Sequence, residues 1–97
     1  MLTSNQRSRL AGIAQTRKDL VQLGKAGATE ALVAQLSRLL SSHELVKLRF
    51  VDRKEGRQEL ALSLAASTGS ELVRVIGNTA IFWKPNPDPE KHTIALD

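Results

Sequence analysis

The order of helical and strand-like segments constrains this chain most, because a given order leaves few ways of building a sheet. Three segments carry apolar residues at helical spacing, and four are short or alternating in the manner of strands. The expected helices span residues 4–18, 30–43 and 53–68, and the expected strands span residues 20–23, 45–51, 72–76 and 79–84. This α-β-α-β-α-β-β order predicts an α/β fold in which three helices and a mixed four-stranded sheet form two layers.

Residues at the ends of the expected helices support these boundaries. Thr3 with Gln6, and Asp52 with Glu55, have the spacing of a capping box, in which the N-cap residue and the residue three positions later exchange hydrogen bonds. Gly69 stands where a C-cap glycine is expected at the end of the third helix. The first and third helices are therefore predicted to begin after Thr3 and after Asp52.

The end of the chain differs in composition from the rest. Gly77 begins a two-residue loop between the last two strands, as is typical of a type II′ hairpin. Three prolines at alternate positions from Pro85 onward then end the sheet, because proline lacks the N–H that a strand ladder needs. One domain is predicted over residues 1–85, followed by a loose tail over residues 86–97.

The composition is that of a small globular protein. The chain has 97 residues, of which 41% are hydrophobic, so it is expected to bury one core of its own. It contains no cysteine, which excludes disulfides and thiolate metal sites and suits a reducing compartment. Neither a secretory signal pattern nor an apolar stretch of membrane-spanning length is found in the sequence. The sequence therefore predicts a soluble cytoplasmic protein with no membrane partner.

The positive charge is concentrated in the part that is expected to fold. The formal net charge is +4, and all but one of the 14 Lys and Arg residues lie in residues 1–84. A basic domain favours polyanions, with nucleic acid the first candidate and an anionic membrane surface the second. An alternative is that this modest excess of charge only keeps the protein soluble.

A G-x-x-G loop follows the first expected strand. It consists of Gly24, Lys25, Ala26 and Gly27, and Thr29 is a suitable N-cap for the helix that comes next. Glycines let the backbone approach a ligand closely, and a helix N-terminus directs free N–H groups and a positive dipole end toward an anion. The loop is therefore predicted to bind phosphate. The motif alone is weak, because tight turns also use glycine.

Catalytic and aromatic constellations are missing from the sequence. Of the two histidines, His43 adjoins Glu44 at the end of the second expected helix, and this pair is interpreted as a helix-end contact rather than as a general base. No metal-ligand spacing or Walker motif occurs, so neither a cofactor nor enzymatic activity is expected. Phe82 and Trp83 are adjacent on one strand and point to opposite faces, and Phe50 is expected in the core. These positions argue against an aromatic platform for stacking bases.

Several stretches resemble one protein family. They are LTSNQR (2–7), VQLGKAG (21–27), HELVK (43–47), ASTG (66–69) and VIGNT (75–79) leading to KPN (84–86). Together they resemble the CRM domain (chloroplast RNA splicing and ribosome maturation), in particular the stand-alone bacterial YhbY-type proteins, over nearly all of residues 2–86. The resemblance implies an α-β-α-β-α-β-β fold like that of the C-terminal domain of bacterial translation initiation factor three.

The same resemblance implies a function. Bacterial members of the family bind RNA and are associated with precursors of the large ribosomal subunit, and the G-x-x-G loop is the family's RNA-contacting element. Two positions depart from the family pattern. Ala26 stands where Asn or Gly is common, and Trp83 with Lys84 stands where a Tyr-Arg pair is common. The second departure puts a bidentate arginine contact at this strand in doubt.

The expected site combines the loop with basic side chains around it. The RNA-binding residues predicted are Gly24, Lys25, Ala26 and Gly27 in the loop, Arg17 and Lys18 before it, and Lys47, Arg49, Arg74 and Lys84 as a second patch on the strands. Arg7 and Arg9 are expected on a solvated face of the first helix. Arg74 is two residues after Leu72 and is expected on the same face of the sheet. The alternative prediction is that its aliphatic stem shields the edge of the core.

The function predicted is that of a monomeric RNA-binding protein whose partner is ribosomal RNA in a precursor of the large subunit. Binding is expected to depend on RNA backbone and shape more than on sequence. The alternative is a protein-interaction module that docks its basic face on an acidic partner protein.

Overall fold

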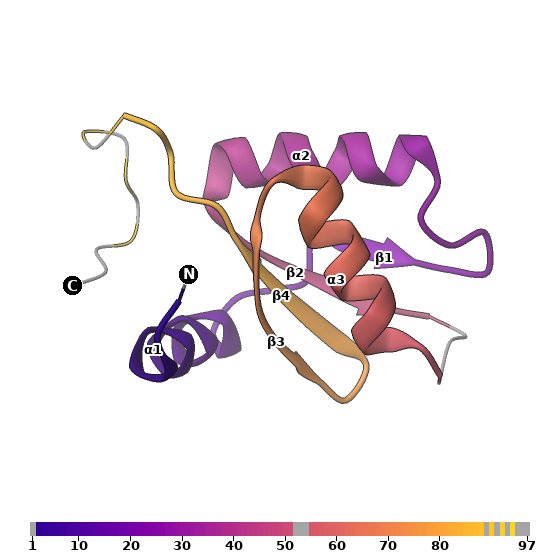
Figure 1. The fold of residues 1–97 in the computed structure, drawn as a ribbon, viewed down its shortest axis with the longest axis horizontal. Helices are drawn as coiled ribbons and strands as arrows, with labels where there is room; N and C mark the ends of the chain where they lie inside the picture. Colours follow the sequence, from indigo (N-terminus) through magenta and orange to yellow (C-terminus); the bar gives the residue numbers. More distant parts are fainter. Residues whose placement is uncertain (1, 52–54, 89, 91, 93, 95–97) are drawn as a thin grey trace.

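The computed structural model describes residues 2–51, 55–88, 90, 92 and 94. Its elements are α1 (Ser4–Gln15), β1 (Val21–Leu23), α2 (Glu30–His43), β2 (Leu45–Phe50), α3 (Arg57–Thr68), β3 (Glu71–Ile76) and β4 (Thr79–Trp83) (Figure 1). This is the order predicted from the sequence. The strands agree with the predicted ranges to within one residue at either end.

The four strands form one mixed sheet in the order β1-β2-β4-β3. Strands β1 and β2 are parallel, and β4 is antiparallel to both β2 and β3. The helix α2 makes the crossover between the two parallel strands, and α3 carries the chain from β2 to the far edge of the sheet (Figure 1). The mixed four-stranded sheet is therefore confirmed, with β1 and β3 at its edges.

The helices cover both faces of this sheet. The main core lies beneath α2 and α3 and contains Leu36, Leu48 and Phe82, each fully buried. A second core lies on the opposite face, where α1 packs against sheet residues that include Leu45 and Ile81 (Figure 1). The mixed α/β fold is confirmed, but the predicted two-layer arrangement was wrong, because helices lie on both faces and the sheet is the middle layer of three. Helix α1 lies on one side of the sheet, and α2 and α3 lie on the other. Because side chains of a β-strand alternate between the two faces, the same sheet supplies residues to both cores.

Helix α1 begins as predicted and ends early. Thr3 and Gln6 exchange the two hydrogen bonds of the expected capping box, at 2.9 and 3.1 Å. The helix ends at Gln15, three residues before the predicted end, with Thr16 as its C-cap. The N–H groups of Thr16 and Arg17 close a last tight turn on the carbonyls of Ile13 and Ala14, and residues 18–20 then form an irregular connection to β1.

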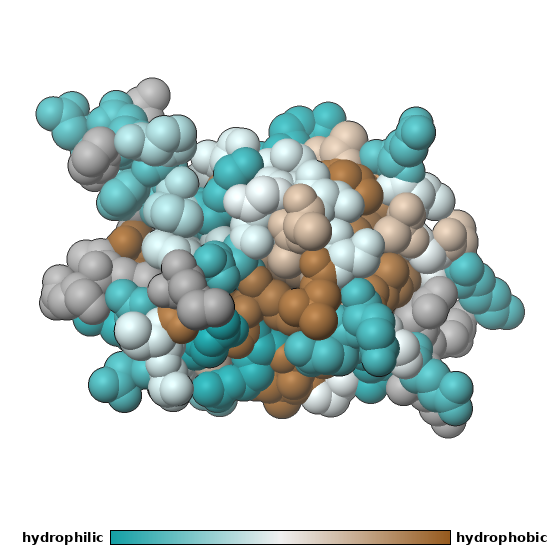
Figure 2. All heavy atoms as spheres, in the orientation of Figure 1, coloured by the Kyte–Doolittle hydropathy of each residue, from teal (hydrophilic) through white to brown (hydrophobic). Residues whose placement is uncertain are grey.

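Arg7 was predicted to face solvent, and this prediction was wrong. Its guanidinium donates hydrogen bonds to the backbone carbonyls of Leu72 and Val73 on β3. It also lines a groove of about 520 Å³ between α3 and β3, together with the half-exposed Leu62. Figure 2 shows hydrophobic surface on the face of the molecule that carries α3. A helical charge pattern gave no sign of this contact, because its acceptors are backbone atoms more than 60 residues away in sequence.

The start of α3 also differs from the prediction. Asp52, the expected N-cap, lies outside the described residues, but α3 begins only at Arg57. Its N-cap is Gly56, whose φ of 71° is left-handed and interrupts a helix approaching from Glu55. The other end is confirmed, since Gly69 is the C-cap with a φ of 66°.

A β-bulge changes the facing of β3. In the ladder with β4, Leu72 pairs with Phe82 and Arg74 pairs with Ile81, so one extra residue stands between them. Residues on the two sides of a bulge no longer alternate in phase. Arg74 therefore lies on the same face of the sheet as Ile81 and on the opposite face from Leu72. The prediction that Arg74 and Leu72 share a face was wrong.

Glu44 connects the end of α2 to the C-terminal segment. It is 2% exposed. Among the described residues, it is the one residue other than glycine with a positive φ, which is 62°. Its carboxylate accepts a hydrogen bond of 2.7 Å from the N–H of Asn86, and its carbonyl accepts one of 2.8 Å from the N–H of Lys84. Farther along the chain, Ile94 is buried in the second core. These contacts hold parts of a segment that was expected to be loose.

Among the described residues, no helix is both long enough and apolar enough to cross a lipid bilayer.

The role of Arg7 gives a stability prediction. Replacing Arg7 with Met removes two hydrogen bonds from a charged donor to the backbone of β3, and we expect the free energy of unfolding to fall by about 1–3 kcal/mol. Chemical denaturation measures this change. Arg9→Met on the exposed side of the same helix is the matched control, with an expected change within about 0.5 kcal/mol. Equal effects of the two substitutions contradict a structural role for Arg7.

Candidate nucleic-acid interface

The G-x-x-G loop forms a closed turn between β1 and α2. The N–H of Gly27 donates to the carbonyl of Gly24 at 3.1 Å, and Gly27 has a φ of 74°. The N–H of Thr29 then donates to the carbonyl of Gly27 at 3.0 Å, and the Thr29 hydroxyl caps α2 by accepting from the N–H of Leu32. These bonds fix the loop at the positive end of the α2 dipole.

The middle of the turn presents backbone donors to solvent. Lys25 and Ala26 are exposed, and within the described residues neither backbone N–H donates to a protein acceptor. At Gly24, an added Cβ atom meets no heavy atom within 4 Å, and its φ is outside the left-handed region. The backbone conformation of the unbound protein therefore favours glycine at position 27 but not at position 24. Free N–H groups beside a position without a side chain are suited to an oxyanion that approaches the backbone.

An uncovered part of the sheet adjoins this loop. Gln22, Arg49, Thr79 and Ile76 lie in one row across all four strands, on the face of the sheet that α1 covers elsewhere. None of the four belongs to the second core beneath α1, and Gln22, Arg49 and Ile76 are exposed. We call these four residues the open row. Gln22 is two residues before Gly24, so the open row continues directly into the loop.

Two more predicted cations lie in the row next to the open row. Lys47 and Arg74 both pair with Ile81 from opposite sides, so their Cα atoms are about 10 Å apart across β4. Arg74 is exposed, whereas Lys47 is half-buried and its Nζ donates to the carbonyl of Arg17 at 3.0 Å. Three of the four predicted strand cations, Lys47, Arg49 and Arg74, therefore share one face of the sheet.

Lys84, the fourth predicted strand cation, lies elsewhere. Its Nζ donates to the carbonyl of Thr68 at 3.0 Å, at the C-terminal end of α3. That bond places its charge on the opposite side of the sheet from Arg49. The structure does not bring Lys84 together with the other predicted RNA-binding residues.

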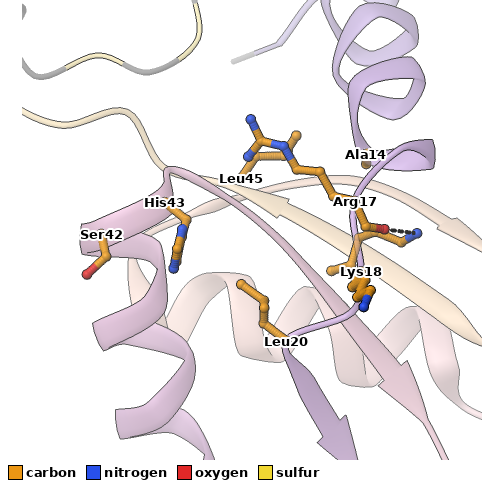
Figure 3. A pocket seen from close by; sticks show the side chains of 8 residues that line it. Ala14, Arg17, Lys18, Leu20, Ser42, His43 and Leu45 are labelled. Carbon is orange, nitrogen blue, oxygen red and sulfur yellow. Dashed lines mark hydrogen bonds between the residues drawn. The ribbon is translucent and has the colours of Figure 1, made fainter.

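Arg17 and Lys18 are not beside the G-x-x-G loop in space, although they precede it closely in sequence. They line an open pocket of about 370 Å³ at the other end of β1, together with Lys47 and residues from the end of α2 (Figure 3). The helix α2 separates the two places, with the loop at its start and His43 at its end, and its 14 residues span about 20 Å. The basic residues therefore form two groups rather than one continuous track.

Sequence reasoning missed five of the eight residues that line this pocket, Leu20 and His43 among them. Leu20 is 43% exposed and His43 is exposed, and the two point toward one another across the pocket in Figure 3. Leu20 was predicted to be the first residue of the strand, and no sequence signal indicated that its side chain is exposed. His43 does not form a site with its neighbour Glu44, because the Glu44 carboxylate is buried against Asn86.

Among the described residues, no group of three or more His, Cys, Asp or Glu side chains is arranged to hold a metal ion.

The fold and the site define a small α/β protein whose sheet is open and basic on one part of one face, next to a loop with free backbone donors. The chain belongs to the CRS1 / YhbY (CRM) domain family, whose model matches residues 2–84. It is 33% identical over 92 residues to a protein of Pseudomonas aeruginosa named as a probable RNA-binding protein, covering 94% of this chain and 88% of that one. It is 29% identical over 89 residues to the probable RNA-binding protein YqeI of Bacillus subtilis, covering 91% and 93%.

A solved structure is similar over almost the whole chain. The solution structure of a hypothetical protein from Staphylococcus aureus matches with a TM-score of 0.82 and 29% sequence identity, covering 98% of this chain and 100% of that one. The fold described above is thus shared with an experimentally determined relative.

The two loop glycines are expected to differ in their importance for stability. Gly27→Ala forces a side chain into a left-handed backbone, so we expect the free energy of unfolding to fall by about 1–2 kcal/mol. Gly24→Ala meets neither a clash nor an unfavourable φ, so the expected change is within about 0.5 kcal/mol. Chemical denaturation of both variants decides this, and a larger loss for Gly24→Ala contradicts the described turn.

Proposed function

We propose that this protein binds RNA through the G-x-x-G loop and the open row beside it. The observation that carries the proposal is the turn itself, in which exposed Lys25 and Ala26 present backbone N–H groups at the start of α2. The names of the relatives from P. aeruginosa and B. subtilis support RNA as the polyanion.

The proposed contacts are made mainly to the RNA backbone. One phosphate accepts hydrogen bonds from the N–H groups of Lys25 and Ala26, and the Lys25 ammonium adds a mobile charge. Gly24 leaves room for this phosphate because no side chain projects there. Arg49 in the open row is placed for a neighbouring phosphate. Such contacts recognise shape and charge and carry little sequence information.

The proposed partner is ribosomal RNA in a precursor of the large ribosomal subunit. Support for this step comes from the family resemblance, since bacterial members are associated with these particles. The protein acts there as a monomeric cytoplasmic binding protein, without catalysis or a cofactor.

Salt dependence tests the loop contact. RNA affinity is expected to fall steeply as the KCl concentration rises, because each neutralised phosphate releases counterions. Lys25→Ala is expected to weaken binding and to reduce the slope of log K against log salt by about 1. Arg38→Ala on the exposed side of α2 removes the same charge away from the loop, and we expect little change in slope. Fluorescence anisotropy with a labelled RNA measures both. Salt-insensitive binding contradicts the proposed clamp.

Gradient sedimentation tests the proposed partner. In a cell extract at low salt, we expect the wild-type protein to migrate with large-subunit precursors and to be released at high salt. A double variant with Lys25→Ala and Gly24→Asp is expected to stay at the top of the gradient, because Asp at position 24 repels phosphate without straining the turn. Co-migration of the double variant places the contact on another face. Free migration of the wild type, together with binding to an acidic protein, favours a protein partner.

A further inference from the structure

The pocket at the other end of β1 is a second and chemically different place on this molecule. We define it by the residues that line it: Ala14, Arg17, Lys18, Leu20, Ser42, His43, Leu45 and Lys47. It lies where the α1–β1 connection, the start of β2 and the end of α2 meet (Figure 3). It is about 20 Å from the G-x-x-G loop along α2, so one phosphate cannot contact both the pocket and the loop.

The lining of the pocket is divided between cations and apolar surface. Arg17, Lys18 and Lys47 supply three positive charges. Apolar lining comes from the exposed Leu20, which lies opposite the planar ring of His43 on α2 (Figure 3), and from the buried Leu45 in the wall. A phosphate alone gains nothing from the apolar surface, and a purely apolar ligand gains nothing from the three cations. A nucleotide has both parts, a planar base with apolar faces and a charged phosphate.

The pocket has a size and support suited to a small ligand. Its volume of about 370 Å³ is within the range of ordinary ligand pockets, roughly 300–1,000 Å³. The bond from Lys47 Nζ to the carbonyl of Arg17 ties the α1–β1 connection to β2 and so fixes the rim that carries Arg17 and Lys18.

We propose that this pocket takes one unpaired nucleotide of the bound RNA, a proposal that rests on the RNA binding proposed above. The base packs against Leu20 and the His43 ring, and the adjoining phosphate lies against Arg17 and Lys18. A base enters a concave pocket only when it is outside a helical stack, so a bulged or single-stranded position is the ligand. The loop thus holds RNA backbone of any sequence, and the pocket selects RNA that exposes a base about 20 Å away.

The test compares three RNA duplexes of about 16 base pairs, a length that exceeds the separation of loop and pocket. One is fully paired, one carries a single bulged adenosine, and one carries an abasic nucleotide at the same bulge. The abasic duplex keeps the bend and the phosphates of the bulge and lacks only the base. Affinities are measured by fluorescence anisotropy at a fixed salt concentration.

We expect the wild-type protein to bind the adenosine bulge on the order of tenfold more tightly than the abasic bulge, as base stacking on a side chain predicts. Leu20→Ala and His43→Ala remove this difference and leave the affinity for the fully paired duplex unchanged. Leu62→Ala is the matched control, since it truncates an exposed leucine on α3 and keeps the difference. Thermal unfolding of each variant shows whether it is folded.

Three results overturn the proposal. Equal wild-type affinities for the adenosine and abasic bulges show that no base enters the pocket, while RNA binding itself stands. A preference that survives both Leu20→Ala and His43→Ala in folded variants moves base recognition to another surface. Failure of the wild type to bind any of the three duplexes overturns the proposed RNA-binding function and this proposal with it.

Discussion

Strand β2 is the constraint on which both the core and the candidate interface depend. It pairs with β1 on one side and with β4 on the other. Val46, Leu48 and Phe50 enter the main core. The alternate residues of the strand, Leu45, Lys47 and Arg49, face the side of α1. Because α1 covers only the Leu45 end, the same strand that anchors the second core presents its charges farther along. The limited area of this face that α1 covers therefore decides which cations of the sheet are exposed to solvent.

The two groups of basic residues suit different tasks in binding one polymer. The contacts proposed for the backbone N–H groups of the G-x-x-G loop depend on the spacing of phosphates, which every RNA has. The pocket between α1 and α2 offers apolar surface and a ring beside its cations, and such surface discriminates between exposed and stacked bases. Under the two proposals, the fixed separation of loop and pocket makes binding depend on a distance along the RNA.

Much of the fold followed from local sequence patterns, because these patterns act over a few residues. Capping by Thr3 and Thr29, the C-cap at Gly69 and the core position of Phe50 were predicted and are present. The missed features depend on structure that no short pattern reports. Gly56 overrides a plausible helix start, and a bulge reverses the facing of Arg74.

The candidate site was predictable in part for the same reason. A loop of four consecutive residues carries its own signal, so the G-x-x-G turn was found directly. The partners of Lys84 and Lys47 are carbonyl groups 16 and 30 residues away, and such contacts exist only once the sheet has formed. The pocket joins residues from three separate elements, so His43 alone gave no sign of it.

The contact of Arg7 with β3 has a consequence for solubility. An edge strand offers a row of carbonyl and N–H groups on which a strand of another molecule can add, and natural sheets protect such edges with charge or irregularity. Here the bulge between Leu72 and Arg74 disrupts the regular ladder, and the Arg7 guanidinium occupies the carbonyls of Leu72 and Val73. The helix that builds the second core thereby also opposes growth of the sheet by strand addition at its β3 edge.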